Sequence, residues 1–169
     1  MDASFKTMKK ELLPLLRSSK LTIVGVGNTM QGDDGIGVHI ADEIKNKAKT
    51  TAVVVAGSTP ENIIGPVIRT KPELILIIDA ADFGGEIGTI GVFDPSTVEE
   101  EAHMGSTHAL PMSMFSKAIK QELSEINILI IGIQAGRTFL GERISKPVRQ
   151  AAKWLVSFLL EAEKYAKVD

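Results

Sequence analysis

The chain has 169 residues, of which 44% are hydrophobic and 24% are charged. Its 19 Lys and Arg residues nearly balance its 21 Asp and Glu residues, and the net charge of −2 gives no reason to expect binding to nucleic acid or to an anionic membrane. The absence of cysteine excludes disulfides, thiolate metal sites and cysteine nucleophiles. Neither a signal peptide nor a membrane-spanning run is recognisable, so we expect a single cytoplasmic domain covering residues 1–169.

Residues 1–19 precede the first apolar run and are expected to form an N-terminal helical extension. Apolar residues recur there at helical spacing from Phe5 to Leu16, but Pro14 lies among them. Proline removes a backbone hydrogen bond and clashes with the preceding turn, so we expect this helix to be kinked or broken.

Five short apolar runs, rich in Val and Ile, are expected to form strands. Most are continuous rather than alternating, which is typical of strands buried on both faces of a mainly parallel sheet. The fourth run follows the third through a glycine-rich turn too short for a crossover helix, so we expect these two strands to be an antiparallel pair. The five runs are residues 21–26, 52–56, 74–78, 89–93 and 128–133.

Segments with helical periodicity separate most of these runs. Strands that alternate with helices favour the α/β class. We therefore expect one three-layer α/β/α domain with a mainly parallel, twisted sheet of about five strands, one of them antiparallel. Apolar stripes at helical spacing mark three expected helices, at residues 36–48, 115–123 and 148–166, and a short fourth helix is expected from residues 59–61 to 69. Ser106 or Thr107 is available as the N-cap of the helix that contains residues 115–123, and Pro147 stands at the first position of the last helix.

The loop at residues 25–35 connects the first strand to a helix and begins with a Gly-x-Gly pattern. A dinucleotide-binding loop would have a third glycine where Met30 stands and an acidic residue at the end of the second strand, which instead ends at Gly57. The dinucleotide interpretation is therefore weak. The loop also carries two acids, Asp33 and Asp34, and either could cap the following helix. Since a cap needs one acid, the second points to another role.

Asp79 ends the third apolar run, at the edge where open α/β sheets place their ligands. A structural acceptor for backbone N–H groups is an equally good interpretation, and Asp82 fits a turn residue. Among the histidines, His108 lies beyond the fourth strand, at the junction between a loop and a helix, where the chain returns toward the sheet. We expect His39 to be a partly buried flank of its helix and His103 to be exposed.

Asp34, Asp79 and His108 would supply two carboxylates and one imidazole if they met at one edge of the sheet. Two carboxylates at close range repel each other unless a cation lies between them. This set of ligands suits a borderline divalent ion such as Zn, Ni or Mn. A metal site is therefore one hypothesis for these three residues.

Five short motifs follow one another along most of the chain. Residues 25–35 hold Gly-x-Gly-Asn followed by two acids and a glycine, residues 79–84 hold Asp-x-x-Asp-x-Gly, and residues 107–108 are Thr-His. The stretches at residues 57–62 and 132–134 complete the set. Together the motifs resemble the [NiFe]-hydrogenase maturation endopeptidases, most closely the branch that serves hydrogenase 3, the formate-hydrogenlyase type.

The resemblance implies that Asp34, Asp79 and His108 contact a metal and that Asp34 and Asp79 are the catalytic residues. It implies a substrate, the nickel-loaded precursor of a [NiFe]-hydrogenase large subunit, which loses a C-terminal peptide. Nickel would come with this substrate, and another divalent cation such as Zn or Cd could take the same site. The hydrolysis would be either aspartic-type or metal-assisted. Ile87 departs from the family pattern, because many members have proline before the glycine there.

Two other functions fit the same residues. A stand-alone divalent-metal peptidase would hold its own metal, and a nickel-binding adaptor would not cleave at all. The absence of cysteine and of a Ser/His/Asp arrangement argues against a covalent acyl-enzyme. The loop at residues 137–146, with Phe139 and Leu140, is long for a connection, which favours contact with the substrate, although a solvated surface loop is an equal alternative.

Overall fold

The computed structural model describes residues 3–95 and 109–166. Helices and strands alternate along most of this length, and two short 3-10 helices, η1 and η2, precede α-helices. The elements are α1 (Ala3–Ser18), β1 (Leu21–Val26), η1 (Gly32–Gly35), α2 (Ile36–Lys45), β2 (Ala52–Gly57), η2 (Pro60–Ile63), α3 (Ile64–Arg69), β3 (Leu74–Ala81), β4 (Ile90–Phe93), α5 (Ala109–Glu122), β5 (Asn127–Gln134) and α6 (Lys146–Glu163).

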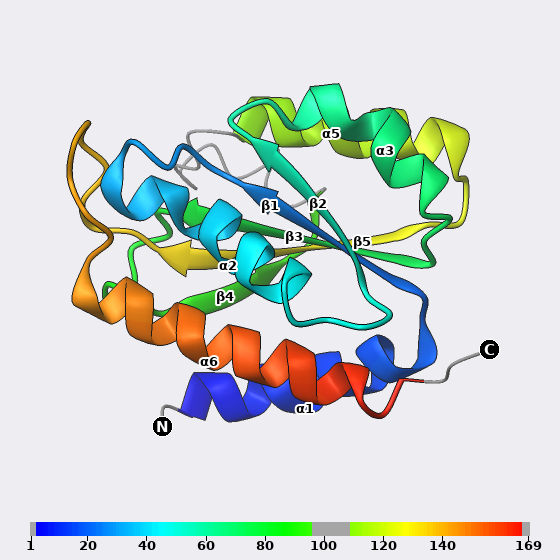
Figure 1. Cartoon of the computed structure of the whole chain (residues 1–169), viewed down its shortest axis with the longest axis horizontal. Helices are drawn as coiled ribbons and strands as arrows, with labels where there is room; N and C mark the ends of the chain where they lie inside the picture. The colour runs from blue at the N-terminus through cyan, green and yellow to red at the C-terminus, as the bar shows by residue number, and fades with distance from the viewer. Residues whose placement is uncertain (1–2, 96–108, 167–169) are drawn as a thin grey trace.

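The strands form one sheet in the order β2-β1-β3-β5-β4, in which β4 alone runs antiparallel to its neighbour. Helices cover both faces: α1, α2 and α6 pack on one face, and α3 and α5 on the other (Figure 1). The expected three-layer α/β/α architecture is therefore confirmed. None of the helices in the described part of the chain is long and apolar enough to cross a membrane.

The predicted pairing of the third and fourth strands is wrong, although the direction of β4 is as expected. The structure inserts β5 between β3 and β4, and β4 pairs antiparallel with β5. The parallel pairing of β3 with β5 runs over eight residues on each strand. This long buried pairing occupies the central position and leaves the four-residue β4 at the edge, where parallel sheets commonly accept an antiparallel strand.

Of the two alternatives for the first helix, kinked or broken at Pro14, the break is wrong. Helix α1 runs without interruption through Pro14, which is exposed. The side chains of Met8, Leu12 and Leu16 are buried in the same cluster as the apolar face of α6. Burial of a large apolar side chain is worth about 1.5–3 kcal/mol, so this stripe offsets the hydrogen bond that Pro14 removes.

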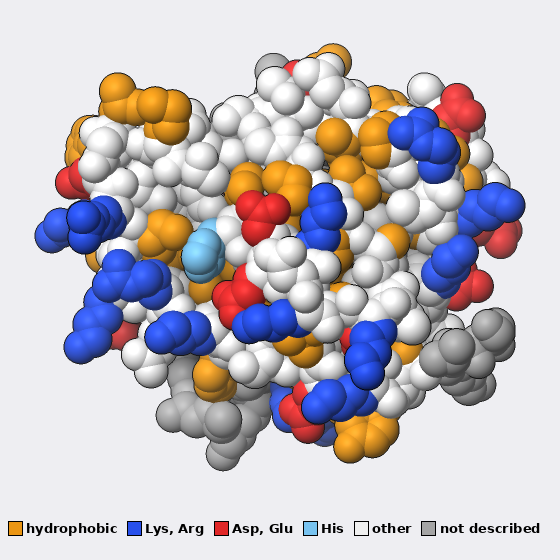
Figure 2. Space-filling model, viewed as in Figure 1, with side chains coloured by type: hydrophobic (Ala, Val, Ile, Leu, Met, Phe, Trp, Pro, Cys, Tyr) orange, Lys and Arg blue, Asp and Glu red, His pale blue; other side chains and the backbone are white. Residues whose placement is uncertain are grey.

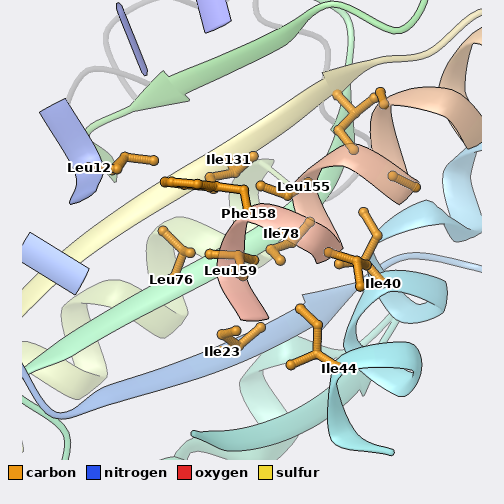
Figure 3. Packing of buried hydrophobic residues seen from close by; sticks show 14 of the residues in the cluster. Leu12, Ile23, Ile40, Ile44, Leu76, Ile78, Ile131, Leu155, Phe158 and Leu159 are labelled. Atoms are coloured by element: carbon orange, nitrogen blue, oxygen red, sulfur yellow. The ribbon is translucent and has the colours of Figure 1, made fainter. Parts of the chain in front are cut away.

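The core on the α6 side draws on helices and strands from both ends of the chain. Figure 3 shows Leu12 of α1, Ile40 of α2 and Phe158 of α6 gathered against the sheet. Every side chain of β3 is buried, and alternate residues point to opposite faces. Burial on both faces explains why residues 74–78 of this strand form a continuous apolar run.

Candidate active site

Helix α2 begins directly against the C-terminal ends of β1 and β3. A Cβ atom on Gly37 would collide with the backbone carbonyl oxygens of Ile78 and Val26, so this close approach requires glycine. Because η1 immediately precedes α2, it is also brought against β3. The packing at Gly37 therefore sets the position of the loop that carries both acids.

Asp34 lies in η1 with 2% of its surface exposed. Its Oδ2 accepts a 2.9 Å hydrogen bond from the backbone N–H of Asn28, which fixes the orientation of the carboxylate. The expectation that Asp33 or Asp34 caps the helix is wrong: Gly35 is the N-cap residue of α2, with no side-chain cap bond. The carboxylates of both acids bind other backbone N–H groups instead.

Asp79 lies in β3 with 1% of its surface exposed, opposite Gly132 of β5. Its Oδ1 accepts a 2.9 Å hydrogen bond from the backbone N–H of Ala80. Since Asp79 follows Ile78 and Asp34 lies one helical turn before Gly37, the two acids come from segments in contact at the C-terminal edge of the sheet. The structure thus brings together the neighbourhoods of two predicted site residues.

The third predicted ligand, His108, lies outside the described residues, as do His103, Ser106 and Thr107. Among residues 3–95 and 109–166, no group of three His, Cys, Asp or Glu side chains is placed to hold a metal ion. His39 is exposed on α2, not partly buried as expected, because its position faces away from the stripe formed by Ile36, Ile40 and Ile44.

Asp33 has a structural role that the sequence analysis missed. Its Oδ2 accepts 3.0 Å hydrogen bonds from the backbone N–H groups of Gly136 and Arg137, and its Oδ1 accepts a 2.6 Å bond from that of Ser145. Burial by itself raises the pKa of Asp33, but these backbone hydrogen bonds outweigh it and bring the pKa below its ordinary value. The second acid of the pair was the available signal, since one acid would have sufficed for a cap.

Gln134 holds the loop that follows Asp79. It is 5% exposed, and its Oε1 accepts hydrogen bonds from the backbone N–H groups of Phe83 and Gly85, at 2.9 and 3.1 Å. Its Nε2 donates to Oδ1 of Asp82 at 3.0 Å. The bond from Gln134, followed by one from the backbone of Gly84, lowers the pKa of Asp82. The turn role expected for Asp82 fits this arrangement.

Ile87 does not disturb the turn in which it replaces the proline of many family members. The backbone N–H of Thr89 donates a 2.9 Å hydrogen bond to the carbonyl oxygen of Glu86, which closes the turn. Gly88 has a φ of +89°, the left-handed conformation that the third residue of a type II turn adopts. Glycine at this position, and not proline before it, is the residue that the turn requires.

Comparisons with known proteins identify the family. A family model described as hydrogenase maturation protease matches residues 38–162. The hydrogenase 3 maturation protease of Escherichia coli (strain K12) is 33% identical over 129 residues, covering 76% of this chain and 81% of that protein. The chain belongs to the hydrogenase maturation protease family. It is therefore a hydrolase that acts on a peptide bond, and the family resemblance seen in the sequence is confirmed.

Solved structures of hydrogenase maturation proteases have the same fold. The crystal structure of a [NiFe] hydrogenase maturation protease from Thermococcus kodakarensis is 31% identical in sequence and has a TM-score of 0.79, covering 91% of this chain and 99% of that one. In sequence, the similarity is as extensive. A putative hydrogenase maturation protease of Methanocaldococcus jannaschii is 29% identical over 164 residues, covering 91% of this chain and 95% of that protein. The similarity thus extends over almost the whole chain.

Proposed function

We propose that this hydrogenase maturation protease removes the C-terminal peptide from the nickel-loaded precursor of a [NiFe]-hydrogenase large subunit in the cytoplasm. The nickel is part of the substrate, whose own cysteines provide most of its ligands. Asp34, Asp79 and His108 recognise it. The observation that carries the proposal is the pair of buried carboxylates, Asp34 and Asp79, on contacting segments at the C-terminal edge of the sheet.

The geometry of the two acids supports a role in binding a cation. Both are nearly inaccessible, and each has one carboxylate oxygen oriented by a backbone N–H group, from Asn28 and Ala80 respectively. Backbone atoms of packed elements stay in place when side chains change rotamer, so the two carboxylates are oriented before the substrate binds. Two preoriented anions favour a divalent cation between them.

A carboxylate of this pair also supplies the base that peptide hydrolysis needs. Asp34 or Asp79 accepts a proton from a water molecule as the water oxygen attacks the scissile carbonyl carbon. The C–N bond then breaks, and the leaving nitrogen takes up the proton. Nickel acts chiefly as the recognition element and, where it reaches the scissile carbonyl, stabilises charge on its oxygen.

The test is cleavage of a purified precursor large subunit, prepared with and without nickel, followed by intact mass spectrometry. We expect the nickel-loaded precursor to lose its C-terminal peptide and the nickel-free precursor to remain whole. The variant D79N is expected to leave both forms uncut. The matched control is D42N, because Asp42 is an exposed acid on α2, away from the sheet edge.

The rival functions give different results in the same experiment. Cleavage of both precursor forms would show that the enzyme does not need nickel to recognise its substrate. Cleavage of short peptides with added Zn would identify a stand-alone metallopeptidase. Tight binding of the nickel-loaded precursor without cleavage would identify an adaptor. Either of the last two results would overturn the proposed reaction.

A further inference from the structure

We propose that a docking rim, formed by Met30, Arg137, Phe139, Leu140, Arg143 and Lys146, binds an acidic segment of the precursor that also carries apolar side chains. This segment is distinct from the one that is cut. The inference rests on the proposed function, because the partner is the substrate named there. It adds a second contact region to the substrate site, formed mainly by the loop between β5 and α6.

The apolar part of the docking rim is unusually accessible. Phe139, Leu140 and Met30 are 74%, 70% and 65% exposed, more than any other large hydrophobic side chain in residues 8–95 and 114–166. The backbone N–H of Gly141 donates a 2.8 Å hydrogen bond to the carbonyl oxygen of Met30, which joins the two loops that carry them. Large apolar side chains gathered on a surface commonly mark a site of protein contact.

The loop that carries Phe139 and Leu140 is held in place at both ends. Asp33 binds the backbone of Gly136 and Arg137 at its start and of Ser145 at its end, and the backbone N–H of Asp33 donates a 2.7 Å bond to the carbonyl oxygen of Arg137. A preorganised surface loses less conformational entropy when a partner binds. A fixed loop with exposed apolar side chains is therefore better explained as a binding surface than as a solvated connection.

The charge around the docking rim selects the partner's chemistry. Residues 137–153 contain five exposed cations and one acid, Glu142, in a chain whose net charge is −2. Figure 2 shows Lys and Arg side chains gathered beside this loop, at the start of α6. Complementary charge steers association and fixes orientation, so the matching segment of the precursor is acidic. The cations are Arg137, Arg143, Lys146, Arg149 and Lys153.

The contact also has a structural link to the candidate active site. Asp33, which holds the loop, is the direct neighbour of Asp34 in η1. A precursor segment seated on the docking rim is thereby positioned relative to the two buried carboxylates. Binding at a remote segment of the substrate then contributes to orientation of the scissile bond.

The experiment measures binding and cleavage of the nickel-loaded precursor by two double variants. In the first, Phe139 and Leu140 are replaced by serine, and in the second, Arg137 and Arg143 are replaced by glutamine. The controls are Met114→Ser and Lys120→Gln, exposed residues on α5. We expect Kd and KM to rise about tenfold in each double variant, with a smaller change in kcat, and little change in the controls. The arginine variant should also make Kd less sensitive to NaCl.

The outcomes separate this inference from the proposed function. If the wild-type protein cleaves the precursor and the double variants match it in Kd and KM, the docking rim is wrong and the function stands. If the wild-type protein binds without cleaving and the variants lose binding, the rim stands and the function fails. If the wild-type protein does not bind the precursor, both are overturned. Circular dichroism and thermal unfolding of each variant exclude a folding defect as the cause.

Discussion

The carboxylate Oδ1 of Asp33 accepts a 2.6 Å hydrogen bond from the backbone N–H of Ser145, 112 residues later in the chain. This bond joins the loop after β1 to the residue before α6. Asp33 and Asp34 are adjacent in sequence, yet Asp33 binds a distant loop, whereas Asp34 binds the backbone of Asn28 in its own loop, next to β3. The acid pair therefore combines a structural residue with a candidate site residue.

Replacing Asp33 by asparagine is expected to destabilise the protein. The amide keeps one acceptor oxygen, loses the charge, and leaves a backbone N–H of Gly136, Arg137 or Ser145 without its acceptor. Hydrogen bonds to charged groups contribute about 1.5–3 kcal/mol each, so urea unfolding should show a loss of that order for D33N. An unchanged unfolding midpoint, equal to that of the control D42N, would show that the loop is held by other contacts.

The effect of D33N should depend on pH. The folded-state pKa of Asp33 lies below its ordinary value of 3.8, so its contribution is present above that value and is lost as the pH falls through the folded-state pKa. The difference in unfolding free energy between wild type and D33N should therefore be full near neutral pH and shrink in acid. A difference that grows in acid would contradict this assignment.

Replacing Asp79 by asparagine is expected to abolish cleavage without destabilising the metal-free protein. The amide oxygen can still accept the bond from Ala80, and removing one of two buried anions relieves repulsion with Asp34. The free energy of unfolding should stay the same or rise by up to about 1 kcal/mol, measured by urea denaturation. A marked loss of stability would show that Asp79 is a structural acceptor, which would weaken its assignment to the site.

Gly37→Ala tests the close contact between α2 and the sheet. The added methyl group meets the backbone oxygens of Ile78 and Val26, and overpacking of this kind costs about 1–3 kcal/mol. The displacement of η1 should also reduce cleavage. The matched control is Gly65→Ala on the exposed side of α3, where alanine has room and should stabilise the helix by about 0.5–1 kcal/mol. Thermal unfolding of the two variants should shift in opposite directions.

Gln134→Leu tests the clamp on the loop after Asp79. Leucine fills a similar volume but leaves the backbone N–H groups of Phe83 and Gly85 without this acceptor. Loss of a buried hydrogen-bond partner costs about 1–3 kcal/mol. The variant should also raise the pKa of Asp82 toward its ordinary value, because the bond from Gln134 is the main cause of its lowering. NMR titration of the Asp82 carboxylate measures this change, and an unaltered titration would contradict the clamp.

Glu163 connects the end of α6 to the loop before β2. Its Oε1 accepts hydrogen bonds from the backbone N–H groups of Lys49, Thr50 and Thr51, at 3.1, 2.8 and 2.7 Å. Burial raises the pKa of Glu163, but these bonds outweigh it and lower the pKa to about 2. Its stabilisation is therefore present above the ordinary value of 4.5 and is lost as the pH falls from 4.5 to about 2.

E163Q should accordingly lower the unfolding free energy near neutral pH by about 1–2 kcal/mol, a figure reduced for the solvent exposure of the carboxylate. Its unfolding free energy should also change less with pH across that acid range. The control is E161Q, which removes an exposed ion pair with Lys9 at 3.5 Å and should have little effect. Parallel pH profiles for wild type and E163Q would refute the assignment.

The apolar runs predicted the five strands and the α/β class because side-chain periodicity is a local property of the chain. Asp34 and Asp79 were recognisable as candidates because an acid at the end of a buried strand or in a glycine-rich loop is visible in the sequence itself. The motifs then identified the family. These inferences needed no knowledge of which segments touch.

Contacts between distant segments were decided by the tertiary structure. The place of β5 between β3 and β4, the unbroken α1 across Pro14, and the partners of Asp33 depend on which pairing buries most surface and satisfies most backbone groups. The free energy of each alternative pairing depends on residues far apart in the chain, so local sequence patterns cannot show which pairing is most stable. Asp33 illustrates the difference: its sequence marks it as a surplus acid, and its partners, 103 to 112 residues away, determine what it does.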